Sequence, residues 1–237
     1  MNALRRLVDW AGNDGAHVLY IPWASSVPAE SYAYFKGLLQ PLLSDAGVQL
    51  AEDPTQGPDS YRKFSEQLKW ATAVFFSGGD QATLLDHVES VAGLLDVFKG
   101  LAQKGMVFGG TSAGLAAMPV TMLTGKGDFT VLDPTKVETR SGLGLVTGVL
   151  LDQHFVRRNR MNRLISVLQG STESCALGVD EDSAISVENN TVETFGESAL
   201  VILHRRPQVH MEAASFGLEL IAGQRTFRLG DLCVSRR

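Results

Sequence analysis

Short apolar segments alternate with segments of helical periodicity along the first half of the chain. The apolar runs are bounded by glycine, proline or polar residues, which is typical of buried strands. The segments between them repeat apolar residues with the spacing of helices that pack on a core. The predicted strands cover residues 17–25, 48–53, 73–79 and 106–110, and the predicted helices cover 29–46, 60–70 and 81–98. This alternation predicts an α/β fold with a mostly parallel sheet and helices on both faces.

The hydrophobic pattern changes toward the C-terminus. A basic segment with helical periodicity runs from residue 153 to about residue 169. Beyond Cys175, apolar and polar residues alternate between turn signals such as Asn189-Asn190, a pattern typical of antiparallel strands and hairpins. No linker composition, repeat or low-complexity tract separates the two patterns. We therefore expect a single α/β domain over residues 1–237.

Composition narrows the classes of function. The 237 residues are 44% hydrophobic and carry a formal net charge of −5, which disfavours general binding to nucleic acid or to anionic membranes. No apolar segment reaches the roughly 18 residues that a membrane helix needs. The N-terminal segment has basic residues but lacks the apolar core of a secretory signal. We therefore expect a cytoplasmic protein with neither a nucleic-acid partner nor a membrane partner.

Cysteine and histidine usage gives no sign of a cofactor. The two cysteines, Cys175 and Cys233, cannot form a disulfide framework, and we expect them to be reduced, although a single bridge stays open. The sequence contains no CxxC pair, zinc-type histidine spacing, dinucleotide-binding glycine pattern or phosphate-loop lysine. We therefore predict neither a metal site nor a bound cofactor.

Residues 110–114 read Gly-Thr-Ser-Ala-Gly and match the pattern G-x-S-x-G on a predicted strand-turn-helix. In such a turn the small neighbours allow a sharp bend that exposes the serine hydroxyl, and the next backbone N–H can donate to an oxyanion. The carboxyl edge of a parallel sheet is also where ligands bind. The alternative is that Ser112 only caps the following helix and that the glycines allow close packing.

A nucleophilic serine needs a base, and His154 is the best placed of the five histidines. His154 follows an apolar run and precedes a predicted helix, so it lies at the end of a predicted strand. Asp180, Glu181 and Asp182 follow another apolar run and could supply a carboxylate that orients the base. Single histidines and acidic turns also occur in proteins without any catalytic role, so these positions alone do not decide whether Ser112 is a nucleophile.

Four sequence blocks together resemble the cyanophycinase family. The family consists of serine peptidases related to aspartyl dipeptidases, with a fold similar to class I glutamine amidotransferases. The blocks occur in the family order; they are FFSGGDQ at residues 75–81, GGTSAG at 109–114, DQHFVRRNRMNRL at 152–164 and GVDEDSAI at 178–185. The resemblance implies that Ser112 is the nucleophile, that His154 is the base and that Glu181 orients the histidine.

The order of these residues and their chemistry agree with such an enzyme. The order serine, histidine, acid differs from that of α/β-hydrolases, where the acid precedes the histidine. A serine hydroxyl is a weak nucleophile until a base removes its proton, and a carboxylate can fix the tautomer of that base. The backbone N–H of Ala113, together with an N–H of Gly78 or Gly79, is the predicted oxyanion hole.

Charged and polar residues near the predicted site are candidates for substrate binding. Arginines at the start of a helix are disfavoured by the helix dipole, so each needs a compensating partner. That partner is either a substrate carboxylate, which arginine binds through two parallel bonds, or an acid on a solvated face, as we expect for Arg157. The resemblance implies a peptide substrate with a β-aspartyl-arginine linkage. The predicted substrate-binding residues are Asp80, Gln81, Asp152, Gln153, Arg158, Arg160 and Arg163.

Several features leave the substrate open. The family has a further strand and a glycine-rich turn before its first helix, whereas this sequence starts inside that helix. Val156 and Asn159 stand where a polar residue and a glycine are common. Small isoaspartyl peptides are therefore an alternative substrate, and an α-aspartyl dipeptidase or a non-catalytic binding protein that keeps the fold is an alternative function. A homodimer is implied by the resemblance alone.

Overall fold

The computed structural model describes residues 3–43, 47–206 and 214–233. The chain divides into two compact units, one spanning Ala3–Ala117 and the other starting at Met118. We call them the N-terminal unit and the C-terminal unit and describe each by itself. In the described residues no helix is both long enough and apolar enough to cross a membrane. The single domain expected from the sequence stays a prediction.

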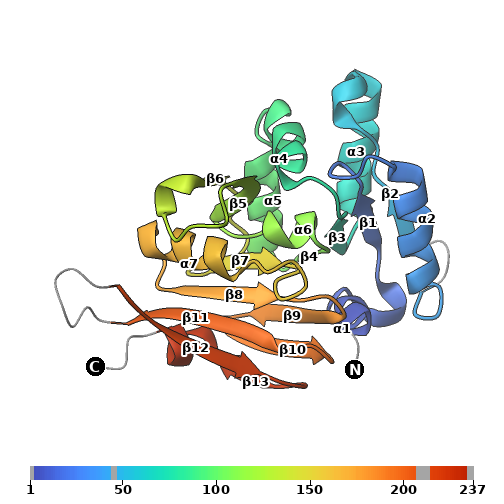
Figure 1. Ribbon diagram of the computed structural model, residues 1–237. Helices are drawn as coiled ribbons and strands as arrows, with labels where there is room; N and C mark the ends of the chain where they lie inside the picture. Colours follow the sequence, from blue (N-terminus) through green and yellow to red (C-terminus); the bar gives the residue numbers. More distant parts are fainter. Residues whose placement is uncertain (1–2, 44–46, 207–213, 234–237) are drawn as a thin grey trace. The chain divides into compact units, whose positions relative to one another are not determined.

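The N-terminal unit contains a four-stranded parallel sheet (Figure 1). Its strands are β1 (Val18–Ile21), β2 (Val48–Leu50), β3 (Ala73–Phe76) and β4 (Val107–Gly110), in the order β2-β1-β3-β4. All neighbouring strands run parallel, so their carboxyl ends lie along one edge of the sheet, where ligands bind in such folds. The parallel sheet predicted from the apolar runs is confirmed.

Helices cover both faces of this sheet because its strands are apolar on both sides. One face carries Tyr20 and Phe75, whose rings stack on Phe35 of α2 at centroid distances of 4.7 and 4.3 Å. The opposite face carries Phe76, whose ring meets Phe98 of α5 edge-on at 5.6 Å. The helices of this unit are α1 (Ala3–Trp10), α2 (Pro28–Leu39), α3 (Pro58–Trp70), α4 (Gln81–Ser90), α5 (Leu94–Gln103) and the short α6 (Ala113–Ala116).

Two predicted helices differ from the periodicity that suggested them. The helix predicted over 29–46 stops before Pro41, which has no N–H to donate the next hydrogen bond of the helix. Its predicted end at residues 44–46 lies outside the described part of the chain. The helix predicted over 81–98 is split into α4 and α5. Gly93 separates them in a left-handed conformation, with φ +76°, that glycine adopts at little cost.

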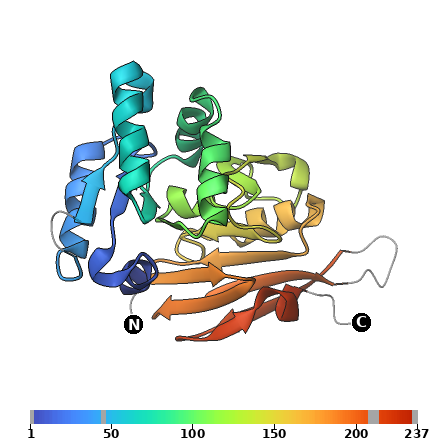
Figure 2. The same ribbon diagram turned by 180° about the vertical axis from the view of Figure 1, so that it is seen from behind.

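The C-terminal unit consists mainly of antiparallel strands (Figure 2). One sheet has the order β12-β11-β8-β7, in which β7 and β8 run parallel and the other neighbours antiparallel. A second sheet has the order β13-β10-β9, and a hairpin pairs β5 with β6. The elements are β5 (Thr121–Gly127), β6 (Val137–Ser141), β7 (Leu150–Gln153), α7 (Met161–Gly170), β8 (Cys175–Val179), β9 (Ser183–Glu188), β10 (Thr191–Gly196), β11 (Leu200–Arg206), β12 (Ser215–Ile221), β13 (Thr226–Arg228) and α8 (Leu229–Cys233). The antiparallel strands predicted beyond Cys175 are confirmed.

Cys175 is fully buried at the start of β8 and is disulfide-bonded. The expectation that the cysteines are reduced is therefore wrong for Cys175. The separation of two cysteines along a sequence does not give the distance between their Cα atoms in the fold, which decides whether they can be bridged. The side chain of Cys233 lies outside the described residues.

Candidate active site

Ser112 lies in a sharp turn between β4 and α6 of the N-terminal unit. Its backbone has φ 51° and ψ −106°, a conformation that residues other than glycine rarely adopt. Ser112 occupies the N-cap position of α6, yet its side chain makes no capping hydrogen bond. The geometry therefore favours the strained turn of a nucleophilic serine over a serine that only caps a helix.

Close packing around this turn requires both glycines of the G-x-S-x-G pattern. A Cβ atom on Gly110 would lie 2.6 Å from the carbonyl carbon of Gly114, and a Cβ atom on Gly114 would lie 2.5 Å from the carbonyl oxygen of Phe76. The Gly114 N–H also donates to the carbonyl oxygen of Ser77 at 3.1 Å. A larger residue at Gly110 would push apart the two ends of the turn, and one at Gly114 would push the turn away from β3, so the pattern is explained by the geometry that positions Ser112.

Backbone N–H groups lie beside this turn. Gly78 follows β3 and is so close that a Cβ atom on it would lie 3.4 Å from the Ser112 Cβ atom. Gly79 has φ +135°, and a Cβ atom there would collide with the carbonyl oxygen of Ala24. Within the described residues, the N–H groups of Gly78, Gly79 and Ala113 have no backbone acceptor. An oxyanion hole requires such N–H donors next to the nucleophile.

Asp80 and Gln81 lie at the start of α4, next to the same strand edge. The Asp80 carboxylate accepts hydrogen bonds from the N–H groups of Ala82 and Thr83 at 2.7 and 3.1 Å, so Asp80 is the N-cap of α4. The Asp80 N–H donates to the carbonyl oxygen of Ala24 at 2.9 Å. Gln81 is buried. These contacts give the Asp80 carboxylate a structural role in fixing the turn after β3.

His154 and Glu181 form a hydrogen-bonded pair in the C-terminal unit. His154 follows β7 and Glu181 lies just beyond β8; these strands pair in parallel with Gln153 opposite Val179, so their carboxyl ends bring the two residues together. The His154 Nδ1 atom lies 3.0 Å from the Glu181 Oε1 atom. When Nδ1–H donates to the carboxylate, Nε2 is the basic nitrogen of the ring.

The surroundings of His154 favour its neutral form. Burial of the ring lowers the pKa of His154 from the ordinary value of 6.5, and the positive charge of Arg158 lowers this pKa further. The hydrogen bond to Glu181 raises the pKa but is outweighed. A histidine that is neutral near pH 7 can accept a proton, as a general base must.

Asp152 and Arg163 form a buried ion pair, with side chains that are 1% and 2% exposed. The Arg163 Nε donates to Asp152 Oδ2 at 2.7 Å and the Arg163 Nη2 donates to Asp152 Oδ1, so the pair is bidentate. The Arg163 guanidinium also lies over the Phe129 ring, 5.3 Å from its centroid. Since each charged group is engaged by the other and shielded from solvent, we assign both residues to holding α7 against β7 rather than to contacting substrate.

Arg160 extends this polar cluster. Its Nη1 atom donates to the carbonyl oxygen of Gln153 at 2.7 Å and lies 3.5 Å from Asp152 Oδ1. Burial, followed by the nearby charge of Arg163, lowers the pKa of Arg160 to about 10. Arg160 therefore stays a cation at neutral pH and is less buried than Arg163.

The basic helix begins later than predicted. Helix α7 starts at Met161, whereas the pattern predicted a helix from residue 153. Positive φ values at His154 (48°) and Asn159 (52°) interrupt helical geometry in this stretch. The earlier arginines therefore lie in a turn, and Arg163, which does lie in the first turn of the helix, has a buried acid to offset the unfavourable dipole.

Arg157 pairs with acids on an exposed face, as the sequence indicated. Its side chain is 74% exposed, and its Nε atom lies 3.8 Å from Glu181 Oε2. Its backbone N–H donates to Asp180 Oδ1 at 3.1 Å. An ion pair this exposed contributes little to stability, but the backbone bond fixes the acidic turn next to His154.

The described residues hold the chemical parts of a serine hydrolase. A strained serine with neighbouring N–H donors lies in the N-terminal unit, and a histidine oriented by a carboxylate lies in the C-terminal unit. These parts are a hydroxyl, an imidazole held by a carboxylate, and backbone N–H groups, which are the groups that serine hydrolases use.

Solved peptidase structures share this fold. The structure matches a peptidase from an acI-B1 Actinobacterium with a TM-score of 0.64 and 19% identity, covering 95% of this chain and 89% of that chain. It also matches a putative peptidase E protein from Listeria monocytogenes EGD-e with a TM-score of 0.57 and 18% identity, covering 81% of this chain and 92% of that chain. Identities this low establish the fold, which is α/β and peptidase E-like.

Sequence comparison identifies the family. Residues 1–195 match peptidase family S51. The chain is 32% identical over 203 residues to a cyanophycinase of Geminocystis herdmanii, covering 84% of this chain and 74% of the relative. It is 28% identical over 216 residues to a cyanophycinase of Nostoc sp., covering 90% of this chain and 72% of the relative. The chain therefore belongs to peptidase family S51, a family of serine peptidases, which confirms the resemblance seen in the four sequence blocks.

Proposed function

We propose that this protein hydrolyses β-aspartyl (isoaspartyl) peptide bonds through an acyl-enzyme on Ser112. His154 is the general base in this proposal, and Glu181 orients its ring. The observation that carries the proposal is the strained backbone of Ser112, with φ 51° and no capping role for its side chain, because such a conformation is kept where it serves a function. The 3.0 Å contact between His154 and Glu181 adds a base with a fixed tautomer.

The reaction follows the chemistry of serine peptidases. The Ser112 Oγ atom attacks the carbonyl carbon of the scissile bond while His154 Nε2 accepts the hydroxyl proton. The N–H groups of Ala113 and of Gly78 or Gly79 stabilise the resulting oxyanion. The imidazolium then gives its proton to the leaving amine as the C–N bond breaks. Water, deprotonated by the same histidine, attacks the ester and releases the aspartyl product.

The relatives named cyanophycinase support a β-aspartyl substrate, and the polar groups around His154 suit it. An aspartyl residue linked through its side chain has a free α-carboxylate, which the exposed cation Arg158 can bind. Arg160 adds a second positive charge. The Oε1 atom of buried Gln153 has no hydrogen-bond partner among the described residues, so it can accept from the substrate's amine.

A panel of dipeptides tests the substrate. The purified protein should hydrolyse β-Asp-Arg, β-Asp-Lys or β-Asp-Leu faster than α-Asp-Leu, measured as kcat/KM by release of free amine, with insoluble cyanophycin assayed beside them. Preference for β-Asp-Arg together with release from the polymer supports a cyanophycinase, whereas hydrolysis of all three β-linked dipeptides without the polymer supports an isoaspartyl dipeptidase. Faster hydrolysis of α-Asp-Leu would establish the α-aspartyl alternative. Binding without hydrolysis of any member would leave a non-catalytic protein.

When the pH is lowered, the Arg158→Gln variant should lose its activity at a higher pH than the wild type does. In the wild type, kcat/KM should decline on the acidic side only below pH 6.5, because a histidine with a lowered pKa stays neutral to lower pH. Removing the Arg158 charge raises the pKa of His154 and moves this decline to higher pH. Arg157→Gln serves as control, since Arg157 is not among the groups that shift this pKa. A decline that stays in place or moves to lower pH in the Arg158 variant would argue against His154 as the base.

A further inference from the structure

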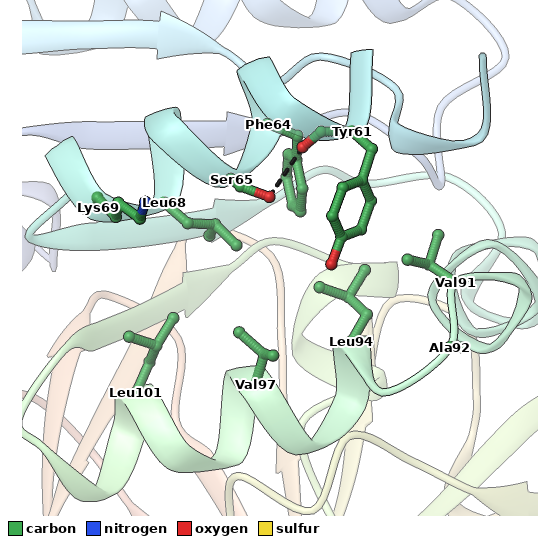
Figure 3. A pocket seen from close by; sticks show the side chains of 10 residues that line it. All are labelled: Tyr61, Phe64, Ser65, Leu68, Lys69, Val91, Ala92, Leu94, Val97 and Leu101. Carbon is green, nitrogen blue, oxygen red and sulfur yellow. Dashed lines mark hydrogen bonds between the residues drawn. The ribbon is translucent and has the colours of Figure 1, made fainter. Parts of the chain in front are cut away.

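A mainly apolar pocket lies between helices α3 and α5 of the N-terminal unit (Figure 3). Its volume is about 230 Å³. Figure 3 shows the Tyr61 ring reaching from α3 toward the side chains of Leu94 and Val97 on α5. The apolar walls are formed chiefly by Tyr61, Phe64, Leu68, Leu94, Val97 and Leu101. The pocket is separate from the serine turn, because its walls come from the two helices and the segment before α5.

The size and lining of the pocket define the apolar part of a ligand. An engineered apolar cavity of about 150 Å³ stays dry and binds benzene. A pocket of about 230 Å³ therefore accepts a chain or ring with roughly ten non-hydrogen atoms. Phe64 and Leu94 are almost completely buried and form a fixed wall, whereas Tyr61 and Val97 are 49% and 45% exposed. The exposed pair provides an opening through which a ligand can enter.

The polar groups around the pocket define the charge of the ligand. Lys69 is the one charged residue that lines it, and Lys69 has no ion pair with any described residue. The Ser65 hydroxyl is already used, because it donates to the carbonyl oxygen of Tyr61 at 2.8 Å. The remaining polar groups are the Lys69 ammonium and the Tyr61 hydroxyl, which can both donate hydrogen bonds. No acidic side chain lines the pocket among the described residues.

We propose that this pocket is a second ligand site, which binds a small monocarboxylate with an apolar chain or ring. The apolar part lies between α3 and α5 against Phe64 and Leu94, and the carboxylate pairs with Lys69 at the rim. This arrangement buries apolar surface in a preformed pocket and leaves the charged groups in contact with water at its edge. The site is independent of the peptidase activity proposed for Ser112.

Isothermal titration of the full chain with octanoate tests this site. Octanoate has about ten non-hydrogen atoms, so we expect saturable one-to-one binding with a Kd of about 10 mM or tighter. Octylamine, which has the same chain with the opposite charge, should bind at least several-fold more weakly because it meets Lys69. Butyrate should bind more weakly because its chain fills only part of the pocket.

Two variants locate the binding. Val97→Trp fills the mouth from an exposed position that tolerates a larger side chain, and it should abolish saturable octanoate binding. Lys69→Gln should weaken octanoate about threefold to fivefold and remove the preference over octylamine. Lys63→Gln is the matched control, since Lys63 also lies on α3 but pairs with Glu52 at 3.6 Å and does not line the pocket. Circular dichroism confirms that each variant is folded.

Three results would overturn the proposal. The first is the absence of octanoate binding up to about 10 mM. The second is octylamine binding as tight as that of octanoate. The third is a dimer, seen by sedimentation velocity, that Val97→Trp converts to a monomer; this would identify the apolar surface as an interface between two copies.

Discussion

The Ser112→Ala variant should lose about 10⁴-fold or more in kcat/KM on the best β-aspartyl dipeptide. Without the hydroxyl no acyl-enzyme can form, and the oxyanion donors and the remaining binding contacts can only assist direct attack by water. The backbone strain at Ser112 should persist, because neighbouring glycines and strand contacts impose it. The loss should therefore appear in turnover rather than in folding, and steady-state kinetics together with thermal unfolding separates the two.

Ser77 offers a matched control for this experiment. It directly follows β3, is fully buried, and its hydroxyl has no hydrogen-bond partner among the described residues. Removing an unpaired hydroxyl leaves no partner unsatisfied, so Ser77→Ala should keep near-normal activity. A fluorophosphonate should label Ser112 in the wild type, as mass spectrometry of the peptides can show. Near-normal hydrolysis by Ser112→Ala, or labelling confined to another serine, would rule out the acyl-enzyme on Ser112.

The sequence was most informative where local sterics determine the geometry. The G-x-S-x-G pattern predicted a sharp turn because Gly110 and Gly114 are the residues that such a turn needs, and the structure shows a clash at both positions for any larger residue. The sequence also placed His154 and Glu181 after apolar runs, and both runs form strands. The parallel pairing of β7 with β8, which brings these two residues to the same edge, was not predicted and comes from the structure.

Pairings between distant elements were not predictable in the same way. Arginine has the same chemistry toward a substrate carboxylate as toward a protein carboxylate, so the sequence could not show that Arg163 is engaged by Asp152. The late start of α7 depends on positive φ at His154 and Asn159, which residue types alone do not require. The pocket between α3 and α5 depends on how two helices pack, and periodicity reports only which side of each helix is apolar.

The buried ion pair gives the second large effect, and this effect is on stability. Arg163→Met should lower the free energy of unfolding by about 3–5 kcal/mol, because Asp152 would stay buried without its main partner. Arg160 lies 3.5 Å from the same carboxylate and offsets part of the lost attraction, so we expect a value near the lower end. Urea unfolding at neutral pH measures the change, and Arg157→Met, at a 74% exposed position, should cost at most about 1 kcal/mol.

A double variant separates the charge from the packing. Asp152→Asn combined with Arg163→Met removes both charges and leaves no unpaired ion in the core, so it should recover part of the loss seen with Arg163→Met alone. If the double variant loses as much as the two single variants added together, Asp152 and Arg163 do not act as a pair. Helix α7 would then be held against the strands by apolar side chains such as Leu164 and Leu168, which are fully buried in the same core. Recovery would instead show that an unbalanced charge, rather than a lost contact, is what destabilises the segment that carries His154.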